Sequence, residues 1–382
     1  MHSIKIGMVG SGFIAHNFAA MIKQMGGHQY NIASILTRRN IDSINDFPYA
    51  EKLTNSVTEL IDKSDLILEC SGNVIHATKV AIATFEAGLP LLTMNSEFHV
   101  TTGSYFSDKG YLSECHGDQP GCLAALKEEA ELMGFKSLIL GNFKGYLNTN
   151  PSEEDMSYWA KKQGFTVKQT TSFTDGTKVQ IEQAFAANAF NGSIFQEGML
   201  GLKTNDYIQT AQELALRADE SAQIMADYII SDAALPSGVF IAGKQHPDQQ
   251  QALATYKLGD GPYYVLHTTY HLCSFEILKT INRYLLGLPP LLNITSAPEI
   301  SVAAIAKIQL DKGQTINSAI GSFECRGSTV YAKQHSSHVP IGILENAVIK
   351  RTVEAGQIIT YDDVELNESE ALEITRNTFN KS

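Results

Sequence analysis

The sequence is short of cysteine and of clustered basic residues, and both shortages exclude classes of protein. Its five cysteines are odd in number and form no Cys-x-x-Cys pair, which disfavours a disulfide framework and a zinc knuckle. This usage fits a reduced cytoplasm, the location that we expect. No run of basic residues is longer than Arg38-Arg39 or Lys161-Lys162, and the net charge is −12. We therefore expect no nucleic-acid partner, although a pocket for a small anion can be locally positive on an acidic protein.

Long hydrophobic runs are also missing. The apolar segment at the N-terminus breaks at Gly10, far short of a membrane-spanning length, and no small-residue cleavage site follows it. We expect neither a signal peptide nor a membrane segment. The 382 residues exceed what one small core organises, and no low-complexity linker divides them. The length predicts two or three domains that pack on one another.

Strand and helix patterns alternate over the first 115 residues. The strand patterns lie at 3–10, 30–37, 64–72 and 88–95, with helical patterns between them, as at 74–88. Such alternation predicts an α/β fold with a parallel, doubly wound Rossmann sheet. We expect a cofactor-binding Rossmann domain at 1–130, an α+β substrate and dimerisation domain at 131–299, and a small β module at 300–382.

The rest of the chain mixes both kinds of pattern. A strand is expected at 135–145, and helices are expected at 174–190 and 205–230. Two segments near the end, 303–316 and 347–359, resemble each other, because each reads as a strand, a bend containing glycine and a second short strand. These segments predict the small C-terminal β module.

The first strand runs into the turn Gly10-Ser11-Gly12-Phe13-Ile14-Ala15, a G-x-G-x-x-A pattern that opens a helix. Gly10 permits the tight turn, Gly12 lets the backbone approach a pyrophosphate, and the small Ala15 lets helix and strand pack closely. The helix N-terminus, with Phe13 and Ile14 in its first turn, offers N–H groups to phosphates. This context predicts a dinucleotide site.

The second strand ends in Thr37-Arg38-Arg39, where an NAD-binding protein carries a carboxylate for the adenine ribose. Two guanidinium groups favour a 2′-phosphate instead, so we expect NADP (NADPH) over NAD. The alternative is that both arginines are merely solvated. After the strand at 64–72, Ser71 and Gly72 are expected under the nicotinamide half of the cofactor, because ligands bind at the carboxyl ends of parallel strands.

The stretch "TDGTKVQIEQAFAANAF" at 174–190 is nearly all apolar or small, yet it carries Asp175, Lys178 and Glu182 at helical spacing. The spacing predicts that these charges line one face of a mostly buried helix. One interpretation is an exposed Lys178/Glu182 pair worth about 0.2–0.5 kcal/mol. The other is a polar site that faces a cavity. The pattern alone leaves both open.

Several motifs together carry a family resemblance. They are "GMVGSGFIA", "ILTRR", "TMNSEFHVTTG", "GDQPG", "GNFKG", "DGTKVQIEQAFAANA", "GDGPYYVLHTTYHLCSFE" and "HVPIGILENAVIKRTVEAGQIITYDDVEL". The chain resembles the homoserine-dehydrogenase-like oxidoreductases that have a C-terminal SAF domain, a group that includes a 1-deoxy-D-xylulose 5-phosphate reductoisomerase-like enzyme. The resemblance implies an NAD(P)-dependent dehydrogenase or reductoisomerase that acts on a small anionic carbonyl or alcohol substrate, with a phosphorylated sugar as the favoured class.

The resemblance also implies a set of site residues. A lysine and acidic residues are expected opposite the nicotinamide, and the matching motifs supply Asp118, Lys144, Asp175, Lys178 and Glu182. An ammonium group suits the reaction, because hydride addition to a carbonyl builds negative charge on oxygen. Lys144 is expected to bind a substrate phosphate or carboxylate. Asn95 is expected beside the nicotinamide, in a turn where Ser96 replaces the usual lysine.

Metal binding and assembly are left open by the residues. Mg²⁺ or Mn²⁺ on Asp118, Asp175 or Glu182 would suit a reductoisomerase, but nothing in the pattern demands a metal. Spacing allows metal pairs at His267/His271 and at His335/His338, and we favour a core role for the first pair. A homodimer is expected from the long helix and the apolar "GPYYVL" strand of the middle domain. The function alternatives are a homoserine-dehydrogenase-like enzyme and a catalytically silent NADP-binding sensor.

Overall fold

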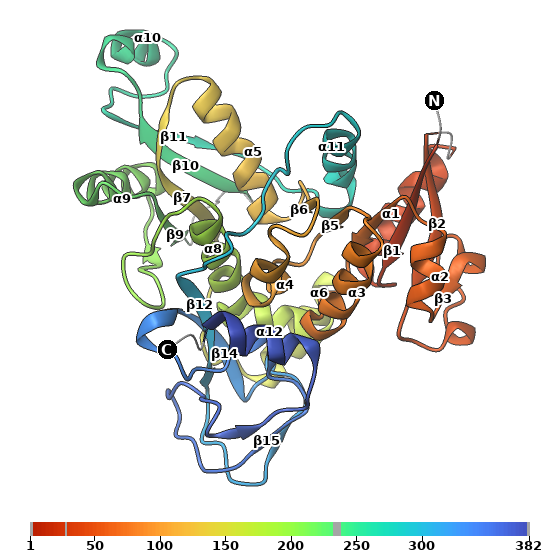
Figure 1. Cartoon of the computed structure of the whole chain (residues 1–382). Coiled ribbons are helices and arrows are strands. Elements are labelled where there is room, and N and C mark those ends of the chain that lie inside the picture. Colours follow the sequence, from red (N-terminus) through yellow and green to blue (C-terminus); the bar gives the residue numbers. More distant parts are fainter. Residues whose placement is uncertain (1–2, 27–28, 232–237, 380–382) are drawn as a thin grey trace. The chain divides into compact units, whose positions relative to one another are not determined.

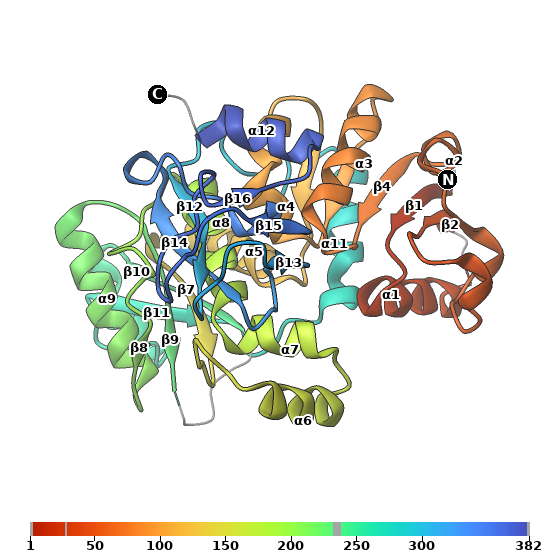
Figure 2. The same cartoon turned by 90° about the horizontal axis from the view of Figure 1, so that it is seen from below.

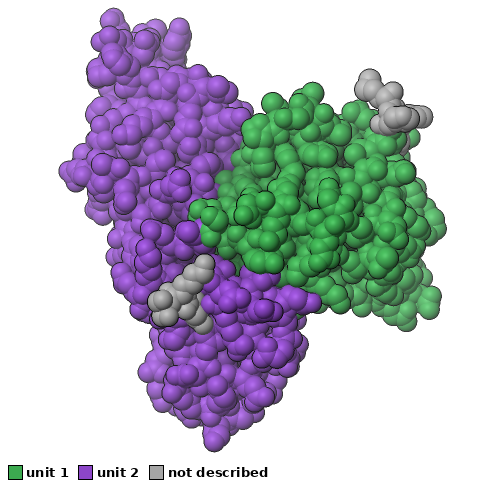
Figure 3. Space-filling view, viewed as in Figure 1, with its two compact units in different colours: residues 1–121, 271–296 green, residues 122–270, 297–382 purple. Residues whose placement is uncertain are grey.

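The computed structural model describes residues 3–26, 29–231 and 238–379 (Figure 1). The chain forms two compact units, which are described separately (green and purple in Figure 3). Unit 1 contains residues 1–121 and 271–296, and unit 2 contains residues 122–270 and 297–382. The predicted domain boundaries at 130 and 299 stay predictions.

Unit 1 is built on a sheet of six parallel strands in the order β3-β2-β1-β4-β5-β6. The strands are β1 (Ile4–Val9), β2 (Tyr30–Leu36), β3 (Leu53–Thr54), β4 (Leu66–Glu69), β5 (Leu91–Thr93) and β6 (Leu112–Glu114). The chain adds β2 and β3 on one side of β1 and then adds β4, β5 and β6 on the other side. The order of the strands thus reverses between β1 and β4. A crevice for ligands opens at such a switch point, outside the carboxyl ends of the strands. The predicted Rossmann arrangement is confirmed.

Helices cover both faces of this sheet. They are α1 (Phe13–Gln24), α2 (Val57–Asp62), α3 (Val74–Glu86), α4 (Ser96–Thr101) and α11 (Cys273–Leu285). Figure 2 shows α1 and α11 on one side of the strands and α2 and α3 on the other. The core between α1 and α11 contains Ala15 and Phe18 of α1 together with Ile277 and Ile281 of α11, all fully buried. Burial of apolar side chains therefore holds α11, which comes from far along the chain, in the Rossmann unit.

Unit 2 contains a mixed sheet in the order β11-β10-β7-β9-β8. Its strands are β7 (Lys136–Lys144), β8 (Leu202–Lys203), β9 (Met225–Ile230), β10 (Val239–Lys244) and β11 (Tyr263–His267). Strand β7 pairs in parallel with β9 and antiparallel with β10. The strand predicted at 135–145 is confirmed as the central strand β7.

The helices of unit 2 depart from two sequence predictions. They are α5 (Gln119–Leu132), which begins in unit 1, α6 (Glu153–Gln163), α7 (Val167–Thr174), α8 (Thr177–Ala189), α9 (Tyr207–Ser221) and α10 (Gln250–Thr255). The single helix predicted at 205–230 is wrong, because α9 ends before Ala222 at φ +55° and the chain continues as β9. The buried aromatic and β-branched residues of "MADYII" fit a central strand better than a helix.

The second departure lies in the stretch 174–190. Helix α7 ends at Thr174, Gly176 adopts φ +86°, and α8 begins at Thr177. Glycine favours this left-handed conformation because it has no Cβ, so the chain turns here. Asp175 therefore lies in the turn, not on a helix face shared with Lys178 and Glu182. The prediction of a mostly buried helix is confirmed for α8.

The C-terminal segment forms two small antiparallel sheets and a final helix. These elements are β12 (Ile300–Ala306), β13 (Thr315–Ile316), β14 (Cys325–Tyr331), β15 (Ala347–Ile349), β16 (Val364–Glu365) and α12 (Glu370–Phe379). Strand β12 pairs with β14, and β15 lies between β13 and β16. The two similar segments of the sequence pair with each other through the bridges Ile305–Ile358 and Leu310–Val353. The predicted small β module is confirmed.

None of the helices that the structure describes is both long and apolar enough to cross a membrane.

Candidate active site

The turn after β1 has the geometry of a dinucleotide-binding loop. Gly10 adopts φ +105°, and a Cβ there would lie 3.0 Å from the carbonyl oxygen of Cys70. A Cβ at Gly12 would meet nothing within 4 Å, which leaves the backbone open to a ligand. Ala15 is fully buried in the core, as the third position of the motif requires. No side chain of the described residues caps the N-terminus of α1. The loop therefore fits a pyrophosphate.

Arg38 and Arg39 lie beside this loop. A cavity of about 280 Å³ is lined by Gly10, Gly12 and both arginines, together with Ser71 and other residues. The buried Thr37 receives a hydrogen bond from the Arg39 backbone N–H at 3.2 Å, and its hydroxyl lies 2.8 Å from that of Ser11. The loop after β2 is thus fixed to the glycine turn, and this loop carries the two arginines that line the cavity.

The loop after β4 forms the other wall. Gly72 adopts φ +63°, and a Cβ there would meet nothing within 4 Å. The Ser71 backbone N–H donates to the Glu69 carboxyl at 2.7 Å. Burial raises the pKa of Glu69, while hydrogen bonds from Ser71, Asn95 and Thr93 act in the opposite direction. This buried carboxyl holds the loop at the carboxyl end of the sheet.

Asn95 is completely buried, and its side chain caps α4 by accepting from the Phe98 N–H at 3.0 Å. Its contact with a cofactor stays a prediction. The neighbouring Ser96 donates to the Asp118 carboxylate at 2.6 Å. Asp118 is buried in the turn before α5. The start of α4 is thereby hydrogen-bonded to the acidic residue of "GDQPG".

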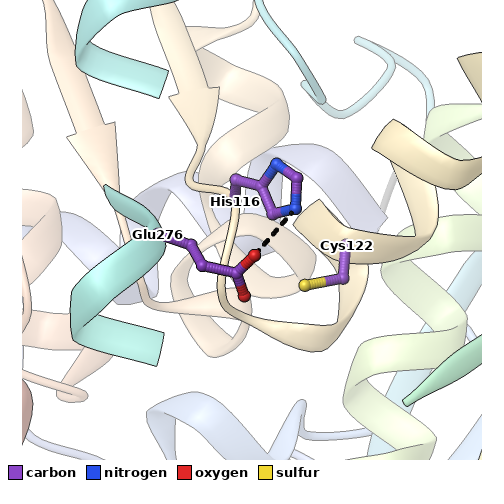
Figure 4. Close-up of side chains that lie close together, drawn as sticks. All are labelled: His116, Cys122 and Glu276. Carbon is purple, nitrogen blue, oxygen red and sulfur yellow. Dashed lines mark ion pairs between the residues drawn. The ribbon is translucent and has the colours of Figure 1, made fainter. Parts of the chain in front are cut away.

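A second polar group of unit 1 lies near the same turn. His116 Nε2 is 3.3 Å from Glu276 Oε1, and Lys279 Nζ is 2.7 Å from the same oxygen (Figure 4 shows the first pair). Burial and then the Lys279 charge lower the pKa of His116. Burial alone would raise the pKa of Glu276, but hydrogen bonds from Lys279 and from the Leu272 N–H lower it. The pair joins α11 to the segment that follows β6.

In unit 2, β7 and α8 bring together three of the predicted catalytic residues. Glu182 Oε2 lies 3.3 Å from Lys144 Nζ and accepts a hydrogen bond from the Asn142 amide at 3.0 Å. Its other oxygen lies 3.8 Å from Lys178 Nζ. The Glu182 side chain is 3% exposed, and those of Lys144 and Lys178 are 18% and 16% exposed. Of the two interpretations that the sequence left open, the exposed Lys178/Glu182 pair is therefore wrong.

Asp175 is held by a different partner. Its Oδ2 lies 2.6 Å from Lys307 Nζ, and both side chains are almost completely buried. Its Oδ1 accepts from the Thr177 N–H at 2.9 Å, at the start of α8. Lys307 follows β12 and also donates to the Ser322 carbonyl at 2.6 Å. Asp175 thus ties the start of α8 to the C-terminal strands, and a catalytic role for it stays a prediction.

Sequence reasoning missed five residues that the structure places at these sites. They are Asn55, His76 and Lys79 beside the arginines, Asn142 beside Glu182, and Lys307 beside Asp175. Two of them had a signal in the sequence. Asn142 precedes Lys144 by two residues on one strand, so both side chains point to the same face. His76 lies in the first turn of a helix that follows a parallel strand, where ligands bind.

The geometry bears on the metal alternatives. Glu182 and Asp175 each lie against lysine ammonium groups, an arrangement opposite to the one that a divalent cation needs. The two ring nitrogens of His338 lie 2.6 Å from the His335 carbonyl oxygen and 2.7 Å from the Ser301 hydroxyl. His335 pairs with Glu197 at 3.0 Å. Both ring nitrogens of His338 and the Nε2 of His335 therefore contact protein groups, and the two histidines do not form a metal pair in this arrangement.

Residues 117–277 match the family model described as Oxidoreductase DRL, catalytic domain. All five predicted catalytic residues, Asp118, Lys144, Asp175, Lys178 and Glu182, lie in this segment. A comparison with curated proteins found no match.

Among solved structures, the chain is similar to homoserine dehydrogenase of S. aureus, with 11% identity, 86% of this chain and 93% of that chain covered, and a TM-score of 0.40. It is also similar to the UDP-N-acetylglucosamine 3-dehydrogenase GnnA of Acidithiobacillus ferrooxidans, with 10% identity, coverage of 77% and 92%, and a TM-score of 0.43. Neither likeness assigns a substrate. With the matched catalytic segment and the Rossmann loop of unit 1, the protein is an NAD(P)-dependent oxidoreductase.

Proposed function

We propose that this protein reduces the carbonyl group of a small anionic compound with NADPH, and that Lys178 protonates the nascent alkoxide. The observation that carries the proposal is the buried cluster in which one carboxylate, Glu182, lies between the ammonium groups of Lys144 and Lys178. Burying charged groups costs free energy, and this cluster places two lysines against one carboxylate, which neutralises only one of the two positive charges. The cluster also lies within the segment that matches an oxidoreductase catalytic domain.

The three residues have separable tasks. When bound, the reduced nicotinamide supplies the hydride. Lys178 stabilises the negative charge that develops on the carbonyl oxygen and donates one proton to it, so that the C=O group becomes CH–OH. Glu182 holds the Lys178 ammonium group in place and is itself oriented by Asn142. Lys144 binds the phosphate or carboxylate of the substrate as a point charge.

The preference for NADPH rests on Arg38 and Arg39. Both line the cavity beside the glycine turn, where an NAD-binding site would offer a carboxylate. We expect both guanidinium groups to bind the 2′-phosphate of the adenosine. Asn95, Ser71 and Gly72 are proposed to contact the rest of the cofactor. A divalent cation is not part of the proposal.

A phosphorylated sugar is the substrate class that we favour, because two lysines of one cluster then meet a carbonyl oxygen and a phosphate. The reaction is either a plain reduction or a reduction coupled to a shift of the carbon skeleton, as in a 1-deoxy-D-xylulose 5-phosphate reductoisomerase-like enzyme. The alternative within the same class is a homoserine-dehydrogenase-like oxidation of a hydroxy acid or semialdehyde. The small C-terminal sheets are proposed to form an SAF-like module, and the active form is proposed to be a cytoplasmic homodimer.

The test is a panel of ketose phosphates, aldose phosphates and semialdehydes offered with NADPH, with cofactor oxidation followed by absorbance and products identified by mass spectrometry and NMR. We expect the wild type to turn over at least one phosphorylated carbonyl compound. The Lys178→Ala variant should turn over the same compound more slowly. A rearranged carbon skeleton identifies a reductoisomerase, and an unchanged skeleton identifies a dehydrogenase. Binding of NADPH without turnover of any compound would instead support the silent sensor and overturn the proposal.

A further inference from the structure

A second cavity of unit 1, of about 430 Å³, lies beside the arginine loop. Arg38 and Arg39 line both this cavity and the cavity at the glycine turn, and His76 lines both as well. Lys79 and Asn55 line only the larger one. The larger cavity therefore extends beyond the glycine turn, toward residues that sequence motifs for dinucleotide binding do not include.

The residues of this cavity come from three elements that fix one another. His76 and Lys79 are three residues apart on α3, so they lie on one helix face. The Asn73 side chain caps that helix by accepting from the His76 N–H at 2.9 Å. Across the cavity, the Asn55 amide donates to the carbonyl oxygens of Thr37 and Arg39, at 2.5 and 3.1 Å. The loop that carries the arginines is thereby fixed.

The lining is uniformly suited to an anion. Of the described residues that line either cavity, none is an aspartate or a glutamate. Three side chains, those of Arg38, Arg39 and Lys79, bring permanent positive charge, and His76 can add a fourth. Like charges repel one another in an empty cavity, so this concentration of cations points to a ligand that carries more than one negative charge.

The positive charges around His76 affect its protonation. Burial, and then the charges of Arg38 and Lys79, lower the pKa of His76 to about 4. Helices α2 and α4 and strand β5 also pack against α3. On α2, Glu59 pairs with Lys63 at 2.6 Å and Asp62 is exposed. On α4 the ionisable groups are Glu97 and His99, and β5 has none. His76 is therefore neutral near pH 7 without a ligand.

We propose that Lys79 and His76 complete, with Arg38 and Arg39, a site for a phosphate monoester on the adenosine ribose, and that His76 takes up a proton when this phosphate binds. The inference rests on the proposed use of NADPH and extends it to α3. A dianionic phosphate reverses the local field, so the charged form of the imidazole becomes favoured. The affinity for a nucleotide with a phosphate on the adenosine ribose then rises as pH falls from 8 towards 6, relative to the affinity of a protein without this histidine.

Isothermal titration calorimetry with adenosine 2′,5′-bisphosphate and with AMP tests the site without any turnover. The full chain and its variants are titrated at pH 6, 7 and 8, in pairs of buffers with different ionisation enthalpies, so that proton uptake is measured directly. Lys79→Ala should lower the preference for the bisphosphate about tenfold, the effect of losing a hydrogen bond to a charged group, with AMP unaffected. Lys23→Ala, on the exposed end of α1, is the control and should change neither affinity.

His76→Asn is the sharper variant. Its preference for the bisphosphate over AMP should equal that of the wild type at pH 8. At pH 6 it should lack the gain in preference that the wild type shows. It should also lack the part of the proton uptake that the bisphosphate causes and AMP does not. Titration of the phosphate itself cancels in this comparison, because both proteins bind the same ligand. If His76→Asn weakens AMP and the bisphosphate equally, the ring contacts the adenine and the proposal for His76 is overturned.

The outcomes separate this inference from the function on which it rests. Equal binding of the bisphosphate and AMP by the wild type would remove the NADPH preference itself. A preference that Arg38→Ala/Arg39→Ala abolishes, but that Lys79→Ala and His76→Asn leave unchanged, would keep the NADPH proposal and overturn only the inference about α3.

Discussion

At the scale of single residues, Glu182 decides how the cluster of unit 2 works. A carboxylate that is 3% exposed and lies within 4 Å of two ammonium groups fixes both of them, because rotating either lysine away would leave a buried negative charge less well paired. The two lysines nevertheless come from different elements, Lys144 from β7 and Lys178 from α8. Their different positions suit different parts of one substrate.

Replacement of Lys178 by alanine should cut kcat by roughly 10²–10⁴, the range typical of losing a positioned acid. Cofactor binding, measured by fluorescence, should be nearly unchanged because Arg38 and Arg39 lie in unit 1. Lys127→Ala is a matched control, since Lys127 also forms an i,i+4 pair with a glutamate and has a similarly exposed side chain. A fully active Lys178→Ala enzyme would show that this lysine is structural.

Replacement of Lys144 by alanine should mainly raise KM. Binding of a distant phosphate is much the same in the ground state and in the transition state, so its loss changes kcat little. Steady-state kinetics on the substrate found by the panel measure the split. A fall in kcat at unchanged KM would assign Lys144 to the reacting oxygen instead.

His99 gives a test of burial through pH. Its ring is completely buried, and burial lowers its pKa from 6.5 to about 3, although the charge of Asp118 acts in the opposite direction. The unfolded chain binds a proton at His99 below pH 6.5 and the native state does not, so this residue lowers stability progressively as pH falls from 6.5 towards 3. Urea midpoints at pH 7, 6 and 5 should fall less steeply for His99→Gln than for the wild type. Parallel pH profiles would contradict the assignment.

Residue types and spacing could single out Gly10 and Gly12, which lie in one local turn after β1, and the arginine pair, which directly follows β2. Lys178 and Glu182 were predictable as a pair because residues four apart along a helix are neighbours in space. Lys307 was not, because it meets Asp175 only after more than a hundred intervening residues have folded. The prediction that Asp175 shares a helix face with Lys178 and Glu182 was accordingly wrong.

At the scale of elements, the start of α8 depends on the C-terminal strands. Thr177 accepts from the Gly327 N–H at 2.9 Å, and Gln180 accepts from the Thr329 N–H at 2.9 Å, so α8 is bound directly to β14. Asp175 and Lys307 add a buried ion pair at the same junction. The position of Lys178 is therefore set partly by a module that helix periodicity does not reveal.

The ion pair at this junction should show strong coupling. Lys307→Met alone leaves the Asp175 carboxylate buried without its ammonium partner, which should cost about 3–5 kcal/mol of unfolding free energy. The double variant Asp175→Asn/Lys307→Met removes both charges and should recover much of that loss. Urea unfolding of the wild type, both single variants and the double variant gives the coupling, and additive effects would show that the two charges do not interact.

Element boundaries failed where two propensities competed. The segment 205–230 has good helix formers up to Ser221, and its apolar end satisfies a helical pattern as well as a strand pattern. Only pairing with β7 and β8 selects the strand, and such pairing is a long-range property. The Rossmann sheet was predictable because its strands and helices alternate at short range, with glycines at the turns.

At the scale of the whole molecule, the order of strands in unit 2 places β11 at an edge of the sheet. This strand contains the "YYVL" of the apolar segment from which a dimer was predicted, and within the strand lies neither a lysine nor a proline of the kind that protects exposed edges. We therefore expect the homodimer to form by pairing of β11 with the β11 of a second copy.

The strand register makes this assembly testable amide by amide. The Thr268 N–H donates to the Val239 carbonyl at 3.0 Å, and in an antiparallel ladder every second N–H points to the same neighbour. The amides of Val265 and His267 consequently point away from β10, on the side where we expect the second copy to pair. Light scattering at micromolar concentration should give twice the chain mass of 41.8 kDa, and hydrogen exchange at these two amides should slow as concentration rises through the dimer equilibrium. A dimer whose two amides exchange fast at every concentration would have another interface, and a monomeric mass would end the prediction of a homodimer.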